Sequence, residues 1–148
     1  MRPSFRFEPV GNGDFEALLA LRIEVMRESL ERIRRFDLQR ARERFATTFK
    51  PQHTRRIVVR DELAGCVATW PEGDAIRLEH FYITAAHQGH GLGSAVVDAL
   101  LHEPAQAGKP VLVGALRGSD ANRFYQRHGF VPVAAGNWDI DYARPASA

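Results

Sequence analysis

Three glycines alternate with other residues in the segment Gln88–Gly93, which reads QGHGLG. Glycine has no side chain and readily adopts positive φ angles, so backbone N–H groups in such a segment can approach a bound anion closely. Apolar residues at helical spacing follow from Ser94 onward, and the N-terminus of a helix adds a partial positive charge. The pattern predicts a site for an anion such as a diphosphate, although a glycine-rich turn that only begins a helix would look the same.

Two better-known phosphate motifs fit this segment poorly. A P-loop requires a Gly-Lys-Ser/Thr tripeptide, which the sequence does not contain. A dinucleotide-binding fingerprint counted from Gly89 requires a third glycine where Ser94 stands, and it opens a βαβ unit. The residues before this loop instead predict an antiparallel meander, which argues against the dinucleotide fingerprint.

Hydrophobic periodicity predicts the elements that position the loop. The first helix covers about residues 15–33, either unbroken or interrupted near Ser29, and the last strands form a hairpin. The pattern predicts strands at 5–9, 56–60, 64–70, 75–83, 111–116, 131–133 and 138–142, and further helices at 38–48, 94–101 and 119–125. No repeat, linker or low-complexity block interrupts them, so we expect one mixed α/β domain over residues 1–148.

The bulk composition limits the function classes. Apolar residues make up 45% and charged residues 26% of the 148, as in folded domains, and a net charge of +2 is too small to indicate nucleic-acid binding. The single cysteine, Cys66, excludes an internal disulfide framework and a cysteine-based zinc cluster, and we expect it to be a core residue. No run resembles a signal peptide or approaches the ~20 apolar residues of a membrane span. We expect a cytoplasmic protein that binds no metal, membrane or nucleic acid.

Three motifs in order resemble the GCN5-related N-acetyltransferases (GNAT). Residues 88–93 are similar to the family's Gln/Arg-x-x-Gly-x-Gly/Ala signature, Leu78–Ile83 to its fourth strand, and Asn122–Phe130 to its Asn-x-x-Tyr-x-x-x-Gly-Phe segment. The resemblance extends from Phe5 to Tyr142 and is weakest in the first two helices. It implies a GNAT-like α/β (α+β) fold: a mixed, mainly antiparallel central sheet with helices on both faces and a splay between strands four and five.

The resemblance implies acetyl-CoA as the co-substrate. The loop amides would hold its diphosphate, the backbone of the fourth strand would pair with the pantetheine arm, and residues 113–116 would line the other side. The residues that the resemblance assigns to the cofactor are Phe81, Tyr82, Ile83, Gln88, Gly89, His90, Gly91, Leu92, Gly93, Ser94, Asn122 and Tyr125.

The implied reaction is direct attack of a primary amine on the thioester within a ternary complex. An alkyl ammonium has a pKa of roughly 10.4 and must lose a proton first, and Glu79 matches the family's general base. Tyr125 matches the tyrosine that assists the thiolate as general acid, and the Tyr82 amide is placed to meet the oxyanion. Glu79 could instead be a solvated strand residue and Tyr125 a packing aromatic. Strand alternation places His80 on the face opposite Glu79, as a structural or substrate-lining residue.

The sequence does not determine which amine accepts the acetyl group. Arginines crowd the first two helices, either as a solvated face or, at Arg22, Arg27 and Arg32, as ligands for a carboxylate on a small amine. Peptide N-termini, protein lysines, polyamines and amino acids remain candidates, whereas basic helices disfavour aminoglycosides. A homodimer also remains open. The alternative function is a catalytically silent coenzyme A-binding sensor, while DNA binding lacks a recognition-helix motif.

Overall fold

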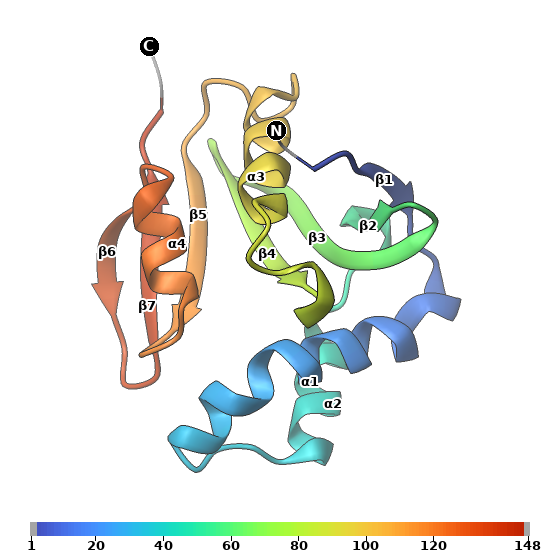
Figure 1. The fold of residues 1–148 in the computed structure, drawn as a ribbon. Coiled ribbons are helices and arrows are strands. Elements are labelled where there is room, and N and C mark those ends of the chain that lie inside the picture. Colours follow the sequence, from blue (N-terminus) through green and yellow to red (C-terminus); the bar gives the residue numbers. More distant parts are fainter. Residues whose placement is uncertain (1–2, 147–148) are drawn as a thin grey trace. The chain divides into compact units, whose positions relative to one another are not determined.

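A computed structural model describes residues 3–146, with seven strands and four α-helices (Figure 1). The helices are α1 (Phe15–Arg32), α2 (Leu38–Thr48), α3 (Leu92–His102) and α4 (Ala121–Arg127). The strands are β1 (Arg6–Pro9), β2 (Thr54–Val59), β3 (Glu62–Glu72), β4 (Ala75–Ile83), β5 (Val111–Leu116), β6 (Val131–Ala135) and β7 (Asp139–Arg144).

The strands form one sheet in the order β1-β2-β3-β4-β5-β7-β6. The β1–β2, β2–β3, β5–β7 and β6–β7 pairs are antiparallel, whereas β4 and β5 are parallel. Only the pairs Ile76↔Val111 and Arg77↔Leu112 join β4 to β5, so the two strands separate beyond them. This mixed, mainly antiparallel sheet with a splay between its fourth and fifth strands confirms the predicted fold class.

The chain forms two compact units, and β3 and β4 each contribute to both. Unit 1 comprises residues 1–68 and 80–93. Its core joins the inward face of α1 to α2 and β3, through Leu18, Leu21, Phe45 and Cys66. The side chain of Asp37 caps α2 by accepting a hydrogen bond from the Arg40 backbone N–H at 3.0 Å.

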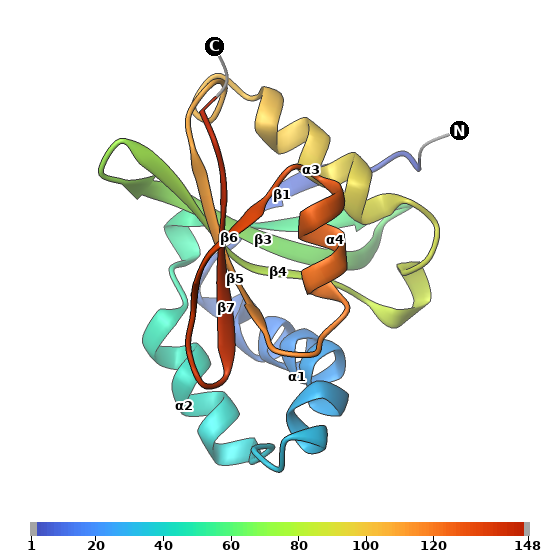
Figure 2. The same ribbon diagram turned by 90° about the vertical axis from the view of Figure 1, so that its left-hand side faces the viewer.

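Unit 2 comprises residues 69–79 and 94–148. Its β5 buries Val111 and Val113 on one face, whereas on the other face Leu112 is half-buried and Gly114 is exposed. Helix α4 lies beside β5 and the β6–β7 hairpin (Figure 2). The Tyr142 hydroxyl on β7 donates a hydrogen bond to Asn122 Oδ1 on α4 at 2.8 Å, which fixes the helix against the strand.

Most predicted element boundaries agree with the structure. The bounds of α2, β4 and β5 match the prediction, and α1 is unbroken at Ser29. Strand β3 extends past its predicted end at Trp70 to Glu72. Pro71 is exposed and next to the last residue of the strand, where a missing backbone donor is tolerated.

Candidate active site

The glycine loop presents a row of unpaired backbone donors. Gly89 and Gly91 have φ angles of +78° and +85°, which only glycine adopts without strain. Within residues 3–146, the backbone N–H groups of residues 89–93 have no hydrogen-bond acceptor, and α3 begins at Leu92. Consecutive free N–H groups at a helix N-terminus form a site for a phosphate or diphosphate.

Side chains of unit 1 hold the loop at the end of β4. Gln88 Nε2 donates to the Ile83 carbonyl at 2.8 Å, and Thr84 Oγ1 contacts His87 Nδ1 at 2.8 Å. The Ala85 N–H donates to a carboxylate oxygen of Glu24 on α1 at 2.6 Å. These contacts order the loop before any ligand binds, which lowers the entropic cost of binding.

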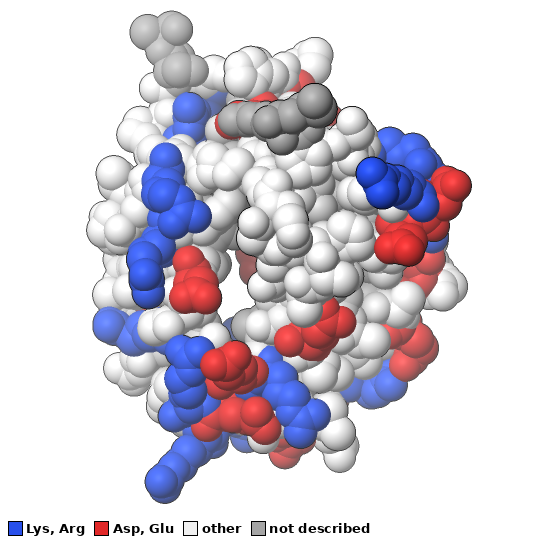
Figure 3. All heavy atoms as spheres, viewed as in Figure 1, with Lys and Arg blue, Asp and Glu red and all other residues white. Residues whose placement is uncertain are grey.

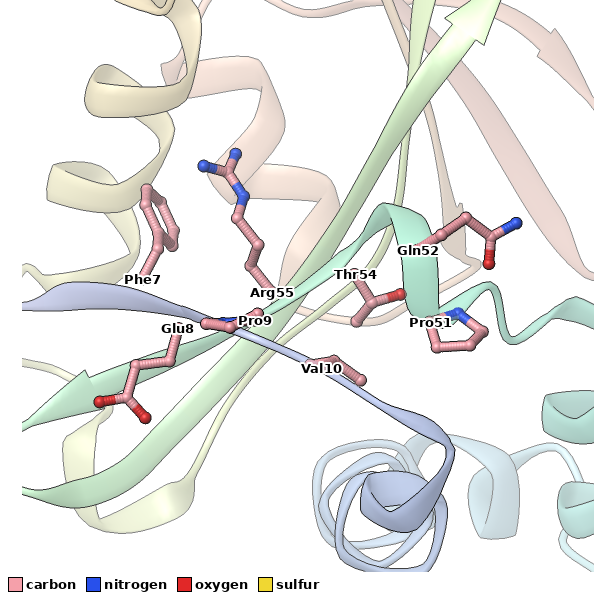
Figure 4. Close-up of a pocket in the computed structure, with 8 residues that line it drawn as sticks. All are labelled: Phe7, Glu8, Pro9, Val10, Pro51, Gln52, Thr54 and Arg55. Carbon is pink, nitrogen blue, oxygen red and sulfur yellow. The ribbon is translucent and has the colours of Figure 1, made fainter.

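Two surface hollows lie within unit 1. The larger, about 800 Å³, is lined by the loop residues His90 and Leu92, together with residues of the β1 and β2 region. The smaller, about 480 Å³, is shown in Figure 4, where the Arg55 side chain extends toward the Phe7 ring. No residue predicted for the site lines this second hollow, so it is separate from the candidate site.

His80 on β4 has a conformation that the sequence does not reveal. Its φ angle is +48°, in the left-handed region that residues other than glycine seldom occupy. The regular alternation that placed Glu79 and His80 on opposite faces is therefore interrupted at His80. The ring is buried, meets the Phe45 ring edge-on at 5.0 Å between centroids, and contacts the Tyr82 hydroxyl through Nδ1 at 3.1 Å.

Burial is the main reason that the pKa of His80 is lowered to about 4, and the nearby Arg22 and Lys50 charges lower it further. The Thr48 backbone acts in the opposite direction. Nε2 is buried and makes no hydrogen bond of normal geometry within residues 3–146. His80 is thus neutral near pH 7, and its Nδ1 atom serves to orient Tyr82.

Arg22 on α1 lies beside His80 and Tyr82 and joins them in one cluster. Its Nη1 donates to the Tyr82 hydroxyl at 3.2 Å, and the residue is only 8% exposed. The structure thus brings together Arg22, predicted for the acceptor, and Tyr82, predicted for the cofactor. Phe81 and Ile83, also predicted for the cofactor, are half-buried on the same strand.

Gly65 on β3 allows the backbone of β4 to approach closely at Tyr82, which was not predicted from the sequence. A Cβ atom at Gly65 would lie 2.2 Å from the Tyr82 carbonyl oxygen, far inside van der Waals contact. Its signal in the sequence is a lone glycine within an apolar strand, a pattern that indicates close approach of another backbone. The neighbouring Cys66 is buried, as predicted, and burial raises the pKa of its thiol to about 12.

In unit 2, Glu79 lies on the sheet face opposite α4. Arg77 pairs with Leu112 and Gly114 pairs with Asp141, so by alternation Glu79, Arg77 and Asp141 share one face. The carboxylates of Glu79 and Asp141 both help to raise the pKa of Arg77, although hydrogen bonding by Glu72 contributes most. Glu79 is the first residue on this face beyond the last β4–β5 pair, at the start of the splay.

Tyr125 lies on the other face of unit 2. It is 6% exposed, and its ring packs against Phe130 and Tyr142 at centroid distances of 5.3 and 6.3 Å. Tyr142 and Val113 form a pair on the face that α4 covers. Glu79 and Tyr125 therefore approach the sheet of unit 2 from opposite sides.

Asn122 and Ser94, both predicted for the cofactor, are engaged within unit 2. The Asn122 amide donates to the carbonyls of Leu116 and Ser119, each at 2.9 Å, and its oxygen accepts from Tyr142. Ser94 Oγ contacts His128 Nε2 at 3.0 Å. In the structure, Asn122 joins the end of β5 to the start of α4, which fixes the position of Tyr125 on that helix.

The outer arginines of α1 are arranged differently from Arg22. Arg27 Nε pairs with Glu31 at 3.3 Å and Arg32 Nη2 pairs with Glu28 at 2.9 Å, and both arginines are more than half exposed. Acidic and basic groups also alternate over the α1–α2 region in Figure 3. These arginines form an ion-paired helix face, whereas Arg22 is largely buried and hydrogen-bonded to Tyr82.

Within residues 3–146, no three His, Cys, Asp or Glu side chains are grouped so as to hold a metal ion. None of the helices in that same range has the length and apolar character to cross a membrane.

Comparisons with known proteins agree on one family. The model of the acetyltransferase (GNAT) domain matches residues 52–132, more than half of the chain, while a search of curated proteins gives no match. An acetyltransferase of Thermus thermophilus has a similar structure, with a TM-score of 0.74, 19% identity, and coverage of 96% of this chain and 97% of its own. The PaiA N-acetyltransferase of Thermoplasma acidophilum, solved in complex with coenzyme A, has a TM-score of 0.75, 11% identity, and coverage of 96% and 99%.

Proposed function

The chain belongs to the GNAT acetyltransferase family, and on that premise we propose that it transfers an acetyl group from acetyl-CoA to a primary amine. The main support for this proposal is the row of backbone N–H groups at residues 89–93, which have no hydrogen-bond acceptor within residues 3–146. These donors and the start of α3 fit a diphosphate. Acetyl-CoA supplies the activated acyl group, and the protein residues bind and orient it and move protons.

A matched pair of glycine variants tests the cofactor site. Gly91→Ala places a side chain at a φ angle of +85°, and Gly73→Ala does so at +61° in the β3–β4 turn. Neither Cβ atom would meet a neighbour closer than 3.8 Å, so each variant should lose about 1 kcal/mol of stability from backbone strain alone. Only Gly91→Ala should also weaken acetyl-CoA binding, by about tenfold or more in calorimetry. Equal affinities in the two variants would contradict the assignment of the loop.

Glu79 is the proposed general base. It is half-buried at the start of the splay, on the face of β4 that α4 does not cover. A carboxylate there can take a proton from an incoming amine, directly or through water. Because Tyr125 lies on the opposite face, the amine would approach from one side of the strands and the leaving thiolate would be protonated from the other.

The test of Glu79 uses its carboxylate neighbour as a control. Glu79→Gln should lower kcat about 100-fold, while Asp141→Asn on the same face should lower it less than about threefold. The loss should shrink at high pH, where more of the amine is already deprotonated. A larger loss in Asp141→Asn than in Glu79→Gln would instead assign the base to Asp141.

Tyr125 is the proposed general acid. Its buried ring is held by Phe130 and Tyr142, which fixes the direction of the hydroxyl. A thiol has a pKa near 8.5, so protonation assists its departure without being indispensable, and Tyr125→Phe should lower kcat about tenfold. Tyr142→Phe is the matched control, and it should affect stability through Asn122 but leave kcat nearly unchanged. Equal kcat losses in both variants would argue against the acid role.

A further inference from the structure

Arg22 is a buried cation without a counter-charge. It lies on α1 beside the core residues Leu18 and Leu21, and it is 8% exposed. Within residues 3–146, no carboxylate lies within ion-pair distance, and the hydrogen bond to Tyr82 is the only one it makes. Burying a charge without a partner is unfavourable, and a fold accepts it most readily where a ligand supplies the opposite charge.

The remaining donors of Arg22 are arranged for a carboxylate. A guanidinium carries five N–H bonds in a planar fork, and only Nη1 is used, by the Tyr82 hydroxyl. Within residues 3–146, Nε and Nη2 make no hydrogen bond and are not among the fully buried atoms. The edge that they form is the one that binds a carboxylate through two parallel hydrogen bonds.

Neighbouring groups hold this donor edge in place, and a second positive charge lies near it. Tyr82 is fixed between Arg22 and His80 Nδ1, and His80 packs against Phe45. Lys50 acts on His80 with the same sign as Arg22, so the surroundings of the cluster favour an anion. Tyr82 lies on the segment of β4 that is expected to carry the pantetheine arm, so an anion on Arg22 would lie close to the thioester.

We propose that Arg22 binds the carboxylate of the acceptor, and that the acceptor is therefore a small amine carrying a carboxylate, such as a free amino acid. This inference rests on the proposed function, because it assigns the substrate of the same site. Arg27 and Arg32 are excluded from this role by their exposure and their pairs with Glu31 and Glu28.

The kinetic test compares amino acids with their amides, which lack the carboxylate. Arg22→Gln should raise KM for the amino acid 10- to 100-fold and change KM for the amide less than threefold. Arg32→Gln, the control on the same helix, should leave both values unchanged. Comparing each variant with the unmodified protein cancels the difference in amine basicity between the two substrates. Equal losses for amino acid and amide, or equal effects of the two variants, would overturn the proposal.

A binding test separates this inference from the proposed function. In the protein saturated with coenzyme A, the Arg22 Nε–Hε NMR signal, assigned by its loss in Arg22→Lys, should shift and saturate with an amino acid but not with its amide. A shift without acetylation of any amine would uphold the carboxylate site and contradict the transferase. Acetylation of neutral amines without a shift would uphold the transferase and overturn the carboxylate site.

Discussion

At the scale of single residues, His80 is the most unusual group in unit 1. It combines a positive φ angle, burial, and a pKa lowered to about 4. Its neutral ring can accept a hydrogen bond from the Tyr82 hydroxyl, which in turn accepts a hydrogen bond from Arg22. Protonation of His80 would place a third positive charge beside Arg22 and Lys50, so the cluster needs His80 to be neutral.

The lowered pKa makes stability depend on pH in a defined window. Between pH 6.5 and about 4 the unfolded chain protonates His80 while the folded chain does not, so this residue stabilises the fold less as the pH falls. The full difference is roughly 3 kcal/mol below pH 4. Urea denaturation gives the free energy of unfolding of the unmodified protein and of His80→Gln at each pH. Between pH 7 and pH 4 this free energy should fall less in the variant. If the free energies of unfolding of the two proteins fell equally with pH, burial of His80 would not be the cause of the pH dependence.

Sequence alone predicts part of this residue-level picture. It selects Arg22, Glu79 and Tyr125 as candidates by type and position, which stay predictions, and the burial of Cys66 is confirmed. It could not separate Arg22 from Arg27 and Arg32, because helical spacing does not show which arginine has an acidic partner. The positive φ angle of His80 also leaves no local signal in the sequence.

At the scale of elements, the close approach of β3 to β4 at Gly65 sets the position of Tyr82. Gly65→Ala must push the Tyr82 carbonyl away, because the new Cβ would lie 2.2 Å from its oxygen. We expect a loss of about 2–4 kcal/mol in the free energy of unfolding, measured by chemical denaturation. Gly13→Ala is the control, since its Cβ would meet nothing within 4 Å. A Gly65 variant as stable as this control would refute the role given to the contact.

Elements with strong periodicity were predicted well. The capped helix α2, the alternating β4 and the apolar β5 have the predicted bounds. The β4–β5 splay came only from the family resemblance, because strand separation depends on partners far apart in the sequence. The register that places Glu79 and Asp141 on one face is likewise a tertiary property.

At the scale of the whole molecule, binding of acetyl-CoA should raise thermal stability. A ligand present at 100 times its Kd that binds only the folded protein adds about 2.7 kcal/mol. For a chain of 148 residues this corresponds to roughly 5 to 10 °C in Tm by calorimetry. ATP, which carries phosphates without a pantetheine arm, is the control and should give a smaller shift. Equal shifts would mean that the loop is a general phosphate site.

The most direct test of the account is a mass balance of acetyl transfer. The purified protein is incubated with acetyl-CoA and a panel of amino acids, their amides, polyamines and peptides, and coenzyme A and acetylated products are quantified by mass spectrometry. We predict one N-acetylated amine per coenzyme A released, fastest with a carboxylate-bearing amine and about 100-fold slower in Glu79→Gln. Tight acetyl-CoA binding without acetylation of any amine would contradict the account and support a coenzyme A sensor.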